Sequence, residues 1–284
     1  MKFSQPTAAL LIPDQQPVEK ALARTTHLAI GAHLDDLEFM SWSAILECFQ
    51  QNDKWYTGVT VTDGRGSARA NQYADYTDEQ MAAVRHREQI KAAQIGEYAA
   101  LAMLDFKSSD IKIPGNPAVI GDIKDLLLAA SPRIVLTHNL ADKHDTHVAV
   151  ALATIQAIRE LPEDKRPKTL HGCEVWRNLD WMSDEDKVVK DVSERENLMM
   201  SIMSVFDSQI SGGKRYDLAT FGRKRANATY FASHATDKAS LLEFAMDLTP
   251  LVKDPKLDVA AFVSQHIERF ARDVETRLRK FQKK

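Results

Sequence analysis

Residues 25–38 read TTHLAIGAHLDDLE, and this stretch decides the fold. Its first part, residues 25–32, is a compact apolar run with a β-branched start, which predicts a strand that ends at His33. The residues that follow, DLEFMSWSAILECFQQN, carry apolar side chains at helical spacing. A buried strand that passes directly into a helix is the repeating unit of a parallel sheet covered by helices.

The same strand-then-helix order continues along the first half of the chain. Further strands are predicted at 55–62, 100–106 and 133–139, and further helices at 77–95, 122–130 and 146–161. Thr77 is the expected N-cap of the second helix. The order predicts an α/β fold of the Rossmann-like, doubly wound kind, with a mostly parallel sheet and helices on both faces.

The sequence predicts three segments along the chain. We expect an N-terminal extension at 1–24, an α/β domain at 25–210 that contains a further strand in GCEVWR, and a helical C-terminal segment at 211–284 packed on the same domain. The last predicted helix, 258–281, carries apolar residues on roughly one face. That stripe favours docking on its own domain over pairing with a second chain, and homo-oligomer formation stays open.

Composition excludes several classes of partner. The 284 residues carry a net charge of −3, with 44% hydrophobic and 27% charged residues, which is typical of a soluble globular protein. No broad basic surface is expected, so nucleic acid and membranes are not predicted partners. Cys48 and Cys173 lie in apolar stretches, which favours buried free thiols in a reducing compartment. The only apolar run near the N-terminus, AALLI, is too short for a signal peptide, and a cytoplasmic protein is expected.

Two clusters of metal-binding side chains lie at predicted strand ends. His33 leaves the tip of the first strand and Asp36 begins the next helix, so both can face one point, while Asp35 between them is left free. His144 and His147 follow the strand at 133–139 and are three residues apart, so they share a face. In a doubly wound sheet the carboxyl ends of the strands form the ligand-binding edge. Two imidazoles and one carboxylate with an open position indicate a catalytic zinc site.

A second copy of the His33 spacing serves as a control. His234 and Asp237 have the same His-x-x-Asp spacing, but they lie in a polar stretch without a comparable preceding strand. Spacing without structural context is mostly accidental, so we expect no metal there.

The run GAHLDDLE closely resembles the AHPDD-x-E signature of the LmbE-like (PIG-L) zinc N-deacetylases. HDTH at 144–147 stands where that family has HPDH, and the segments VTDGRG, VRHREQIKAAQIG and DSQ resemble the family as well. The resemblance covers roughly 25–210. It implies a zinc-dependent hydrolase that removes an acetyl group from an N-acetylated amino sugar or a similar small N-acyl substrate.

Carried over by position, the resemblance implies a role for each residue of the two clusters. His33, Asp36 and His147 would bind Zn²⁺, for which Fe²⁺ or Co²⁺ could substitute. Asp35 would be the general base, and His144 would stabilise the oxyanion or act as the acid. Three positions depart from the family pattern: Leu34 replaces a proline, Asp145 replaces the proline of HPDH, and Thr146 replaces the aspartate that supports the first histidine of HPDH. Asp142 is a candidate substitute for that aspartate.

Substrate contacts and alternatives complete the prediction. Arg65 and Arg85 are candidates to reach sugar hydroxyls or a phosphate, and a solvated surface position is the competing interpretation for each. An ion pair between Arg85 and Glu88 would explain both residues without a function. The alternatives are a zinc amidase acting on a different conjugate and a non-catalytic nucleotide- or sugar-binding module. No GxGxxG or Walker motif follows a strand, which disfavours the nucleotide-binding module.

Overall fold

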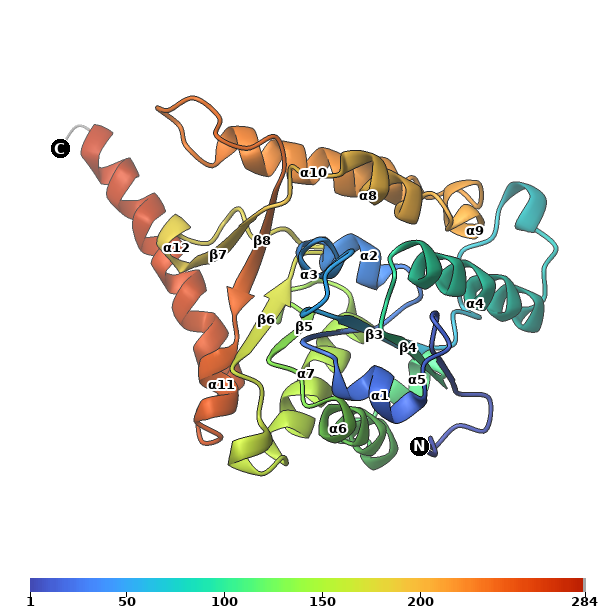
Figure 1. Cartoon of the computed structure of the whole chain (residues 1–284). Coiled ribbons are helices and arrows are strands. Elements are labelled where there is room, and N and C mark those ends of the chain that lie inside the picture. The colour runs from blue at the N-terminus through green and yellow to red at the C-terminus, as the bar shows by residue number, and fades with distance from the viewer. Residues whose placement is uncertain (283–284) are drawn as a thin grey trace.

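The computed structural model describes residues 1–282, which contain one mixed sheet of eight strands in the order β1-β4-β3-β2-β5-β6-β8-β7 (Figure 1). The strands are β1 (Ala9–Leu11), β2 (His27–Gly31), β3 (Tyr56–Thr62), β4 (Ala100–Phe106), β5 (Ile134–His138), β6 (Thr169–Cys173), β7 (Lys187–Asp191) and β8 (Leu242–Asp247). Strands β4, β3, β2, β5 and β6 run parallel, whereas the pairs β1·β4, β6·β8 and β7·β8 are antiparallel. The predicted doubly wound, mostly parallel α/β fold is confirmed.

Helices cover both faces of the sheet. They are α1 (Val18–Ala23), α2 (Asp36–Met40), α3 (Trp42–Cys48), α4 (Asp78–Ile95), α5 (Ser108–Ile111), α6 (Pro117–Ala130), α7 (Asp145–Arg159), α8 (Glu196–Met203), α9 (Asp207–Ile210), α10 (Tyr216–Tyr230), α11 (Thr249–Lys253) and α12 (Val259–Phe281). In Figure 1, α2, α3, α4 and α8 lie above the sheet, and α1, α6 and α7 lie below it. Each layer encloses its own apolar core, and every residue of the central strand β2 is buried. A parallel strand covered on both faces needs such a continuous apolar run.

The structure differs from the expected elements at four places. The helix expected after Asp36 breaks at Ser41, where a helical bond from Ser43 to Phe39 is replaced by tertiary bonds: the Ser43 N–H donates to Glu243 over 3.4 Å, and the Phe39 carbonyl accepts from Lys224 over 3.2 Å. The expected strand GCEVWR is shifted, because β6 ends at Cys173. Both chain ends also contribute strands: β1 lies within the expected extension 1–24, and β8 lies within the segment 211–284 that was expected to be helical.

The strand order creates a switch point between β2 and β5. The chain moves from β2 outward to β3 and β4, then returns to pair β5 on the other side of β2. Helices that leave β2 and β5 therefore diverge to opposite faces, and a crevice opens at the carboxyl ends of these two strands. Each of the two predicted metal-binding clusters follows one of these strands: His33 and Asp36 follow β2, and His144 and His147 follow β5.

Two further features bear on the expected surroundings of the protein. Cys48 and Cys173 are free and buried, as expected. Among the helices of residues 1–282, none is both long enough and apolar enough to span a bilayer.

Candidate metal site

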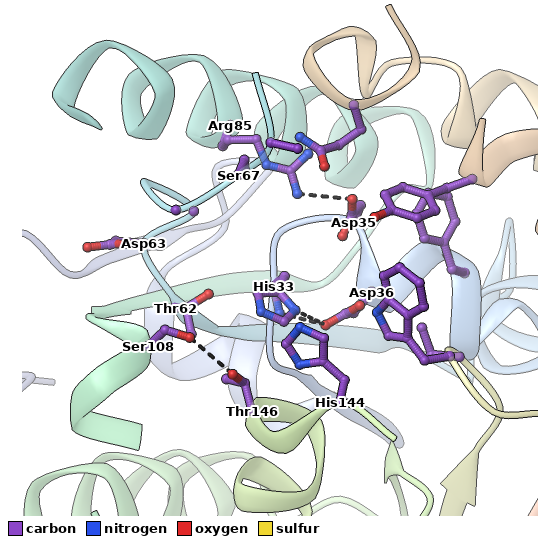
Figure 2. Close-up of a pocket in the computed structure, with 18 of the residues that line it drawn as sticks. His33, Asp35, Asp36, Thr62, Asp63, Ser67, Arg85, Ser108, His144 and Thr146 are labelled. Carbon is purple, nitrogen blue, oxygen red and sulfur yellow. Dashed lines mark hydrogen bonds and ion pairs between the residues drawn. The ribbon is translucent and has the colours of Figure 1, made fainter. Parts of the chain in front are cut away.

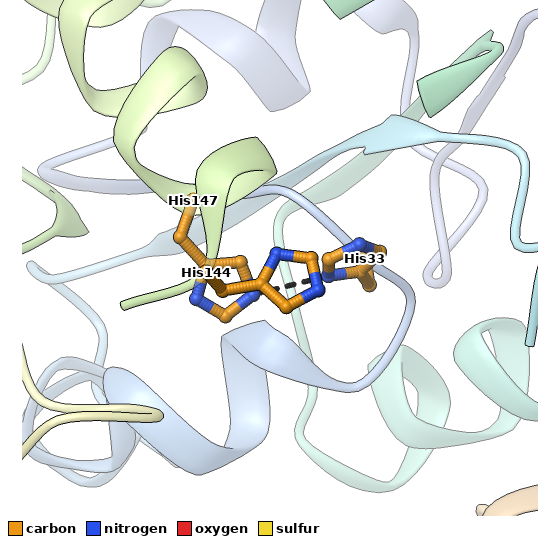
Figure 3. A group of neighbouring side chains, drawn as sticks. All are labelled: His33, His144 and His147. Atoms are coloured by element: carbon orange, nitrogen blue, oxygen red, sulfur yellow. Dashed lines mark hydrogen bonds between the residues drawn. The ribbon is translucent and has the colours of Figure 1, made fainter. Parts of the chain in front are cut away.

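The crevice at the switch point contains a cavity of about 680 Å³. His33 lies two residues after β2, and Asp36 is the first residue of α2. His144 is the N-cap residue of α7 and His147 lies in its first turn. Figure 2 shows the side chains of His33, Asp36 and His144 close together among the lining residues, and Figure 3 shows His147 reaching His33 from α7. Residues far apart in the sequence thus meet at one edge of the sheet.

Three side-chain atoms lie at the separations that one tetrahedral ion requires. The distance from His33 Nδ1 to Asp36 Oδ2 is 3.2 Å, and that from His33 Nδ1 to His147 Nε2 is 3.1 Å. The distance from His147 Nε2 to Asp36 Oδ2 is 3.4 Å. Metal bonds of about 2.0–2.1 Å in a tetrahedron put ligand atoms roughly 3.3–3.5 Å apart. The donor set and its spacing therefore fit Zn²⁺ or a similar divalent ion.

The charges in the cluster also favour a cation. Burial raises the pKa of Asp36, but His147, His138 and His33 outweigh burial and hold that pKa well below its usual value. Burial lowers the pKa of His147, but the Asp36 and Asp142 carboxylates outweigh it and raise that pKa above its usual value. The Asp36 carboxylate therefore stays ionised and attracts positive charge. A metal ion can supply that charge in place of the proton on His147.

His138 is a fourth imidazole at the site that the sequence analysis missed. It ends β5, and its ring stacks on His147 at a centroid distance of 3.9 Å. Its Nε2 accepts the Ala32 backbone N–H over 2.8 Å, so this imidazole ties the tips of β2 and β5 together. Burial lowers the pKa of His138 to about 4, which keeps the ring neutral. A histidine that ends an apolar strand beside two other histidines is the signal that could have identified it.

Asp142 supports His147 rather than the His144 ring. Its Oδ2 lies 3.4 Å from His147 Nδ1 and accepts the Trp176 backbone N–H over 3.1 Å, while its Oδ1 accepts the His144 backbone N–H over 2.9 Å. Within residues 1–282, His144 Nδ1 has no hydrogen-bond partner, so the expected support for this ring is not formed. Thr146 bonds Ser108 across 3.0 Å instead. The carboxylate thus orients the imidazole of an expected ligand.

Replacing Asp142 by Asn should weaken metal binding by roughly 10- to 100-fold, because the carboxylate that orients His147 is lost. A titration against a chromophoric chelator measures the affinity. The matched control is Asp145→Asn, which removes an exposed carboxylate from the same motif and should leave the affinity unchanged. Equal affinities for the two variants would contradict the role of Asp142.

Asp35 lines the cavity and has a strained backbone conformation. Its φ is +119°, in the left-handed region that residues other than glycine rarely adopt, so the surrounding structure must hold it there. Its N–H donates to Gln89 Oε1 over 3.0 Å, and its carboxylate pairs with Arg85 at 3.0 Å, as Figure 2 shows for Arg85. Burial raises the pKa of Asp35 to about 8, against the lowering effect of Arg85. A carboxylate fixed beside the ligand cluster is suited to proton transfer.

Gln89 is itself fixed by Glu38. Its Nε2 donates to Glu38 Oε1 over 2.7 Å, and the Tyr98 hydroxyl donates to the same oxygen over 2.7 Å. Glu38, Gln89 and Tyr98 are all buried. This chain of hydrogen bonds sets the direction of the Gln89 amide and, through it, the backbone of Asp35.

The two predicted substrate-binding arginines differ. Arg65 pairs with Asp63, is partly exposed and lines the cavity. Arg85 is buried, so the surface interpretation is wrong for it; it lies 3.6 Å from Glu88 as well as 3.0 Å from Asp35. The sequence indicated the Arg85–Glu88 pair but not the contact with Asp35.

An aromatic wall forms the other side of the cavity. Trp176 stacks on His144 with centroids 6.1 Å apart and meets Tyr216 edge-to-face at 5.8 Å. Phe39 and Tyr216 were not expected there. His144 is half-buried in this setting, and burial together with the charges of His147 and His33 lowers its pKa to about 4. The ring is therefore neutral near pH 7.

Two further groups of polar side chains, the basic run 223–225 and the pair His234 and Asp237, form no site within residues 1–282. Of the basic run 223–225, Arg223 lines the cavity and donates to the Val175 carbonyl, Lys224 is buried against Glu243, and Arg225 pairs with Glu196. These side chains point in three directions, so they make no common binding surface. His234 and Asp237 are exposed, and no metal-binding group in the described part of the chain includes them.

Comparisons with known proteins agree with this site. Residues 28–158 match the family model PIG-L, GlcNAc-PI de-N-acetylase. A search of curated proteins gave no significant match.

Several solved structures share the fold. N,N'-diacetylchitobiose deacetylase from Pyrococcus horikoshii has 15% identity and a TM-score of 0.62, covering 84% of this chain and 88% of that one. The 4-carboxy-2-hydroxymuconate hydratase GalB from Pseudomonas putida KT2440 has 15% identity and a TM-score of 0.61, covering 79% and 96%. The A40926 pseudoaglycone deacetylase Dbv21 has 20% identity and a TM-score of 0.58, covering 79% and 97%. Because a hydratase stands beside deacetylases, the fold does not determine the reaction.

Proposed function

We propose that this chain is a metal-dependent hydrolase that removes the acetyl group from an N-acetylated amino sugar or a similar small N-acyl substrate, because residues 28–158 match the PIG-L family model. One observation carries the proposal: the donor atoms of His33, Asp36 and His147 lie 3.1–3.4 Å apart, and His33 and Asp36 line the same cavity as the separate carboxylate of Asp35. We propose Zn²⁺ as the ion, with Fe²⁺ or Co²⁺ as substitutes.

Asp35 and His144, beside the proposed ligands, have separate roles in amide hydrolysis. A bound divalent ion would supply Lewis acidity that polarises the amide carbonyl, activates water and favours the ionised form of Asp35. Asp35 accepts the proton of the water molecule as its oxygen attacks the carbonyl carbon. His144, as a neutral ring, donates an N–H to the carbonyl oxygen while negative charge develops there. The C–N bond then breaks, the amine nitrogen takes from Asp35 the proton that this carboxylate received from water, and acetate and free amine leave.

The lining of the cavity fits a sugar. Trp176 lines the cavity and is partly exposed, so its indole can contact a pyranose ring. Thr62 and Arg65, which line the same cavity, offer hydroxyl and guanidinium groups to sugar hydroxyls. We propose Arg65 as a substrate contact, and we propose that Arg85 acts through Asp35, because the two are paired at 3.0 Å.

The direct test is incubation of the zinc-loaded protein with N-acetylglucosamine and N,N'-diacetylchitobiose. We expect acetate and primary amine to appear in equal amounts and to disappear when the metal is removed. Acetate-free turnover of another amide would favour an amidase for a different conjugate. Binding without turnover of either sugar, at full zinc occupancy, would favour a non-catalytic module.

Replacing Gln89 by Leu should lower kcat by roughly 10- to 100-fold, at the level expected when a group that orients a catalytic residue is lost. Leucine can neither accept the Asp35 N–H nor bond Glu38, so Asp35 loses its support. Steady-state kinetics and zinc analysis measure the effect. KM and zinc content should stay close to those of the wild type.

Gln94→Leu is the matched control for Gln89→Leu, because Gln94 is exposed on the same helix α4. Its kinetic constants should not change. A Gln89 variant with wild-type kcat would remove this residue from the support of Asp35.

We also propose a cytoplasmic location. Burial raises the pKa of the Cys48 thiol to about 12, and both cysteines are free. Unreactive free thiols are typical of proteins in reducing compartments.

A further inference from the structure

The C-terminal helix α12 is attached to the body of the protein along its first half only. Phe262 packs against the larger apolar core, and Asp186 contacts both His266 and Arg269. Beyond these contacts, all residues from Phe270 to Gln282 are exposed. Figure 1 shows the second half of α12 standing clear of the sheet and of the other helices. Several turns of helix thus project into solvent.

The projecting half and the turn before it carry an apolar stripe, made of Ile267, Phe270, Val274, Leu278 and Phe281. These side chains are between 39% and 80% exposed. None of them belongs to an apolar cluster formed within residues 1–282. At about 100° per residue they fall within a narrow band on one side of the helix. Isolated helices of this length are marginal in water, so a stripe of this kind favours a partner.

We propose that this stripe binds the same stripe of a second copy of the chain, with the two helices antiparallel. The intervals between its residues are three, four, four and three, which read the same in both directions from Val274. A two-fold axis at Val274 therefore brings Ile267 of one copy to Phe281 of the other, and Phe270 to Leu278. A two-fold interface requires a surface that is complementary to itself, and this stripe meets that condition.

Charges beside the stripe agree with the antiparallel arrangement. One flank of the stripe carries Asp273 and Arg277. Reversal about Val274 brings Arg277 of the second copy to within two positions of Asp273 along the helix axis. In antiparallel helices, equivalent flanks of the two helices face each other, so Asp273 of each copy meets a guanidinium of the other. Opposite charges at the flanks set partner choice and orientation.

A membrane surface fits this helix less well. Helices that lie on bilayers carry a mainly basic polar face. Here the polar side is occupied by internal ion pairs of both signs: Glu268 with Arg272, Asp273 with Arg277, and Glu275 with Arg279. Five apolar residues from each copy make an interface at the small end of the known range, so the dimer should be reversible and depend on concentration.

Two measurements test the proposal on the full chain, and neither depends on the proposed enzymatic activity. Sedimentation of the wild type should show a mass that rises toward twice that of the chain with concentration. Phe270→Lys combined with Leu278→Lys should remain monomeric throughout. A wild type that stays monomeric at the highest concentration overturns the proposal, whether or not it binds vesicles of anionic phospholipid.

Cysteine substitutions test the orientation. Val274 lies on the proposed axis, so Val274→Cys should form a disulfide-linked dimer on mild oxidation, while the native cysteines are buried and stay silent. Thr276→Cys, on the opposite side of the same helix, is the matched control and should stay monomeric. Phe270→Cys mixed with Leu278→Cys should cross-link far more than either alone. Equal cross-linking of each alone would indicate parallel helices and overturn the antiparallel pairing.

Discussion

The substitution Asp35→Asn should lower kcat by roughly 100- to 10,000-fold, the range expected when a general base is lost, and should leave zinc at one ion per chain. Asparagine has the shape of aspartate but cannot accept the proton of the attacking water. The donor atoms of His33, Asp36 and His147 meet without Asp35, so the metal should remain. Steady-state kinetics and metal analysis of the same preparation give the two readouts.

The separation of these readouts makes the Asp35 test specific. Loss of zinc together with activity would mean that Asp35 is a ligand and that the roles of the two neighbouring aspartates are wrongly divided. Retention of both zinc and activity would mean that another group takes the proton. Asp75→Asn, at an exposed carboxylate, controls for a general effect of removing a negative charge.

The substitution His33→Ala should weaken zinc binding by more than about 100-fold, which exceeds the effect of losing a group that only orients a ligand. With two protein ligands left, the ion should be lost on dialysis and hydrolysis should fall to the background. The thermal stabilisation that zinc gives the wild type should also disappear, because that stabilisation equals the binding free energy gained by the folded state, about 2.7 kcal/mol at a hundredfold excess over Kd.

His234→Ala is the matched control for His33→Ala. His234 has the same spacing to an aspartate as His33, but it lies exposed in a loop. Isothermal titration with Zn²⁺ should give wild-type binding for this variant. If both variants lost zinc equally, or if neither did, the assignment of the metal to the switch point would be wrong.

The local pattern of apolar residues was sufficient to predict the central strands of the sheet. The apolar run before His33 and the run before Asn139 are continuous strands buried on both faces, and their order along the chain leads to the parallel sheet. Pattern failed at β8, Leu242–Asp247, which lies between β6 and the edge strand β7. All of its residues except Asp247 are buried, and a short apolar run without alternation is compatible with a helix as well.

The site was predictable where one short motif supplied its groups. His33, Asp35 and Asp36 follow a single strand, so their meeting point could be inferred from the sequence. Gln89 and His138 could not, because their roles depend on tertiary hydrogen bonds: Gln89 reaches Asp35 from a helix 54 positions away, and His138 reaches Ala32 across 106 positions. Arg85 was misjudged for the same reason, since helix spacing shows its neighbour Glu88 but not its burial.

The gap of 114 positions between His33 and His147 has a consequence for the order of folding. Closing so long a loop is slow and entropically costly, and the two strand tips come together only when β5 pairs with β2. Before that step the proposed ligands are still separated: His33 and Asp36 lie after β2, and His147 lies after β5. Uptake of an ion during refolding should therefore report the moment at which the two halves of the sheet join.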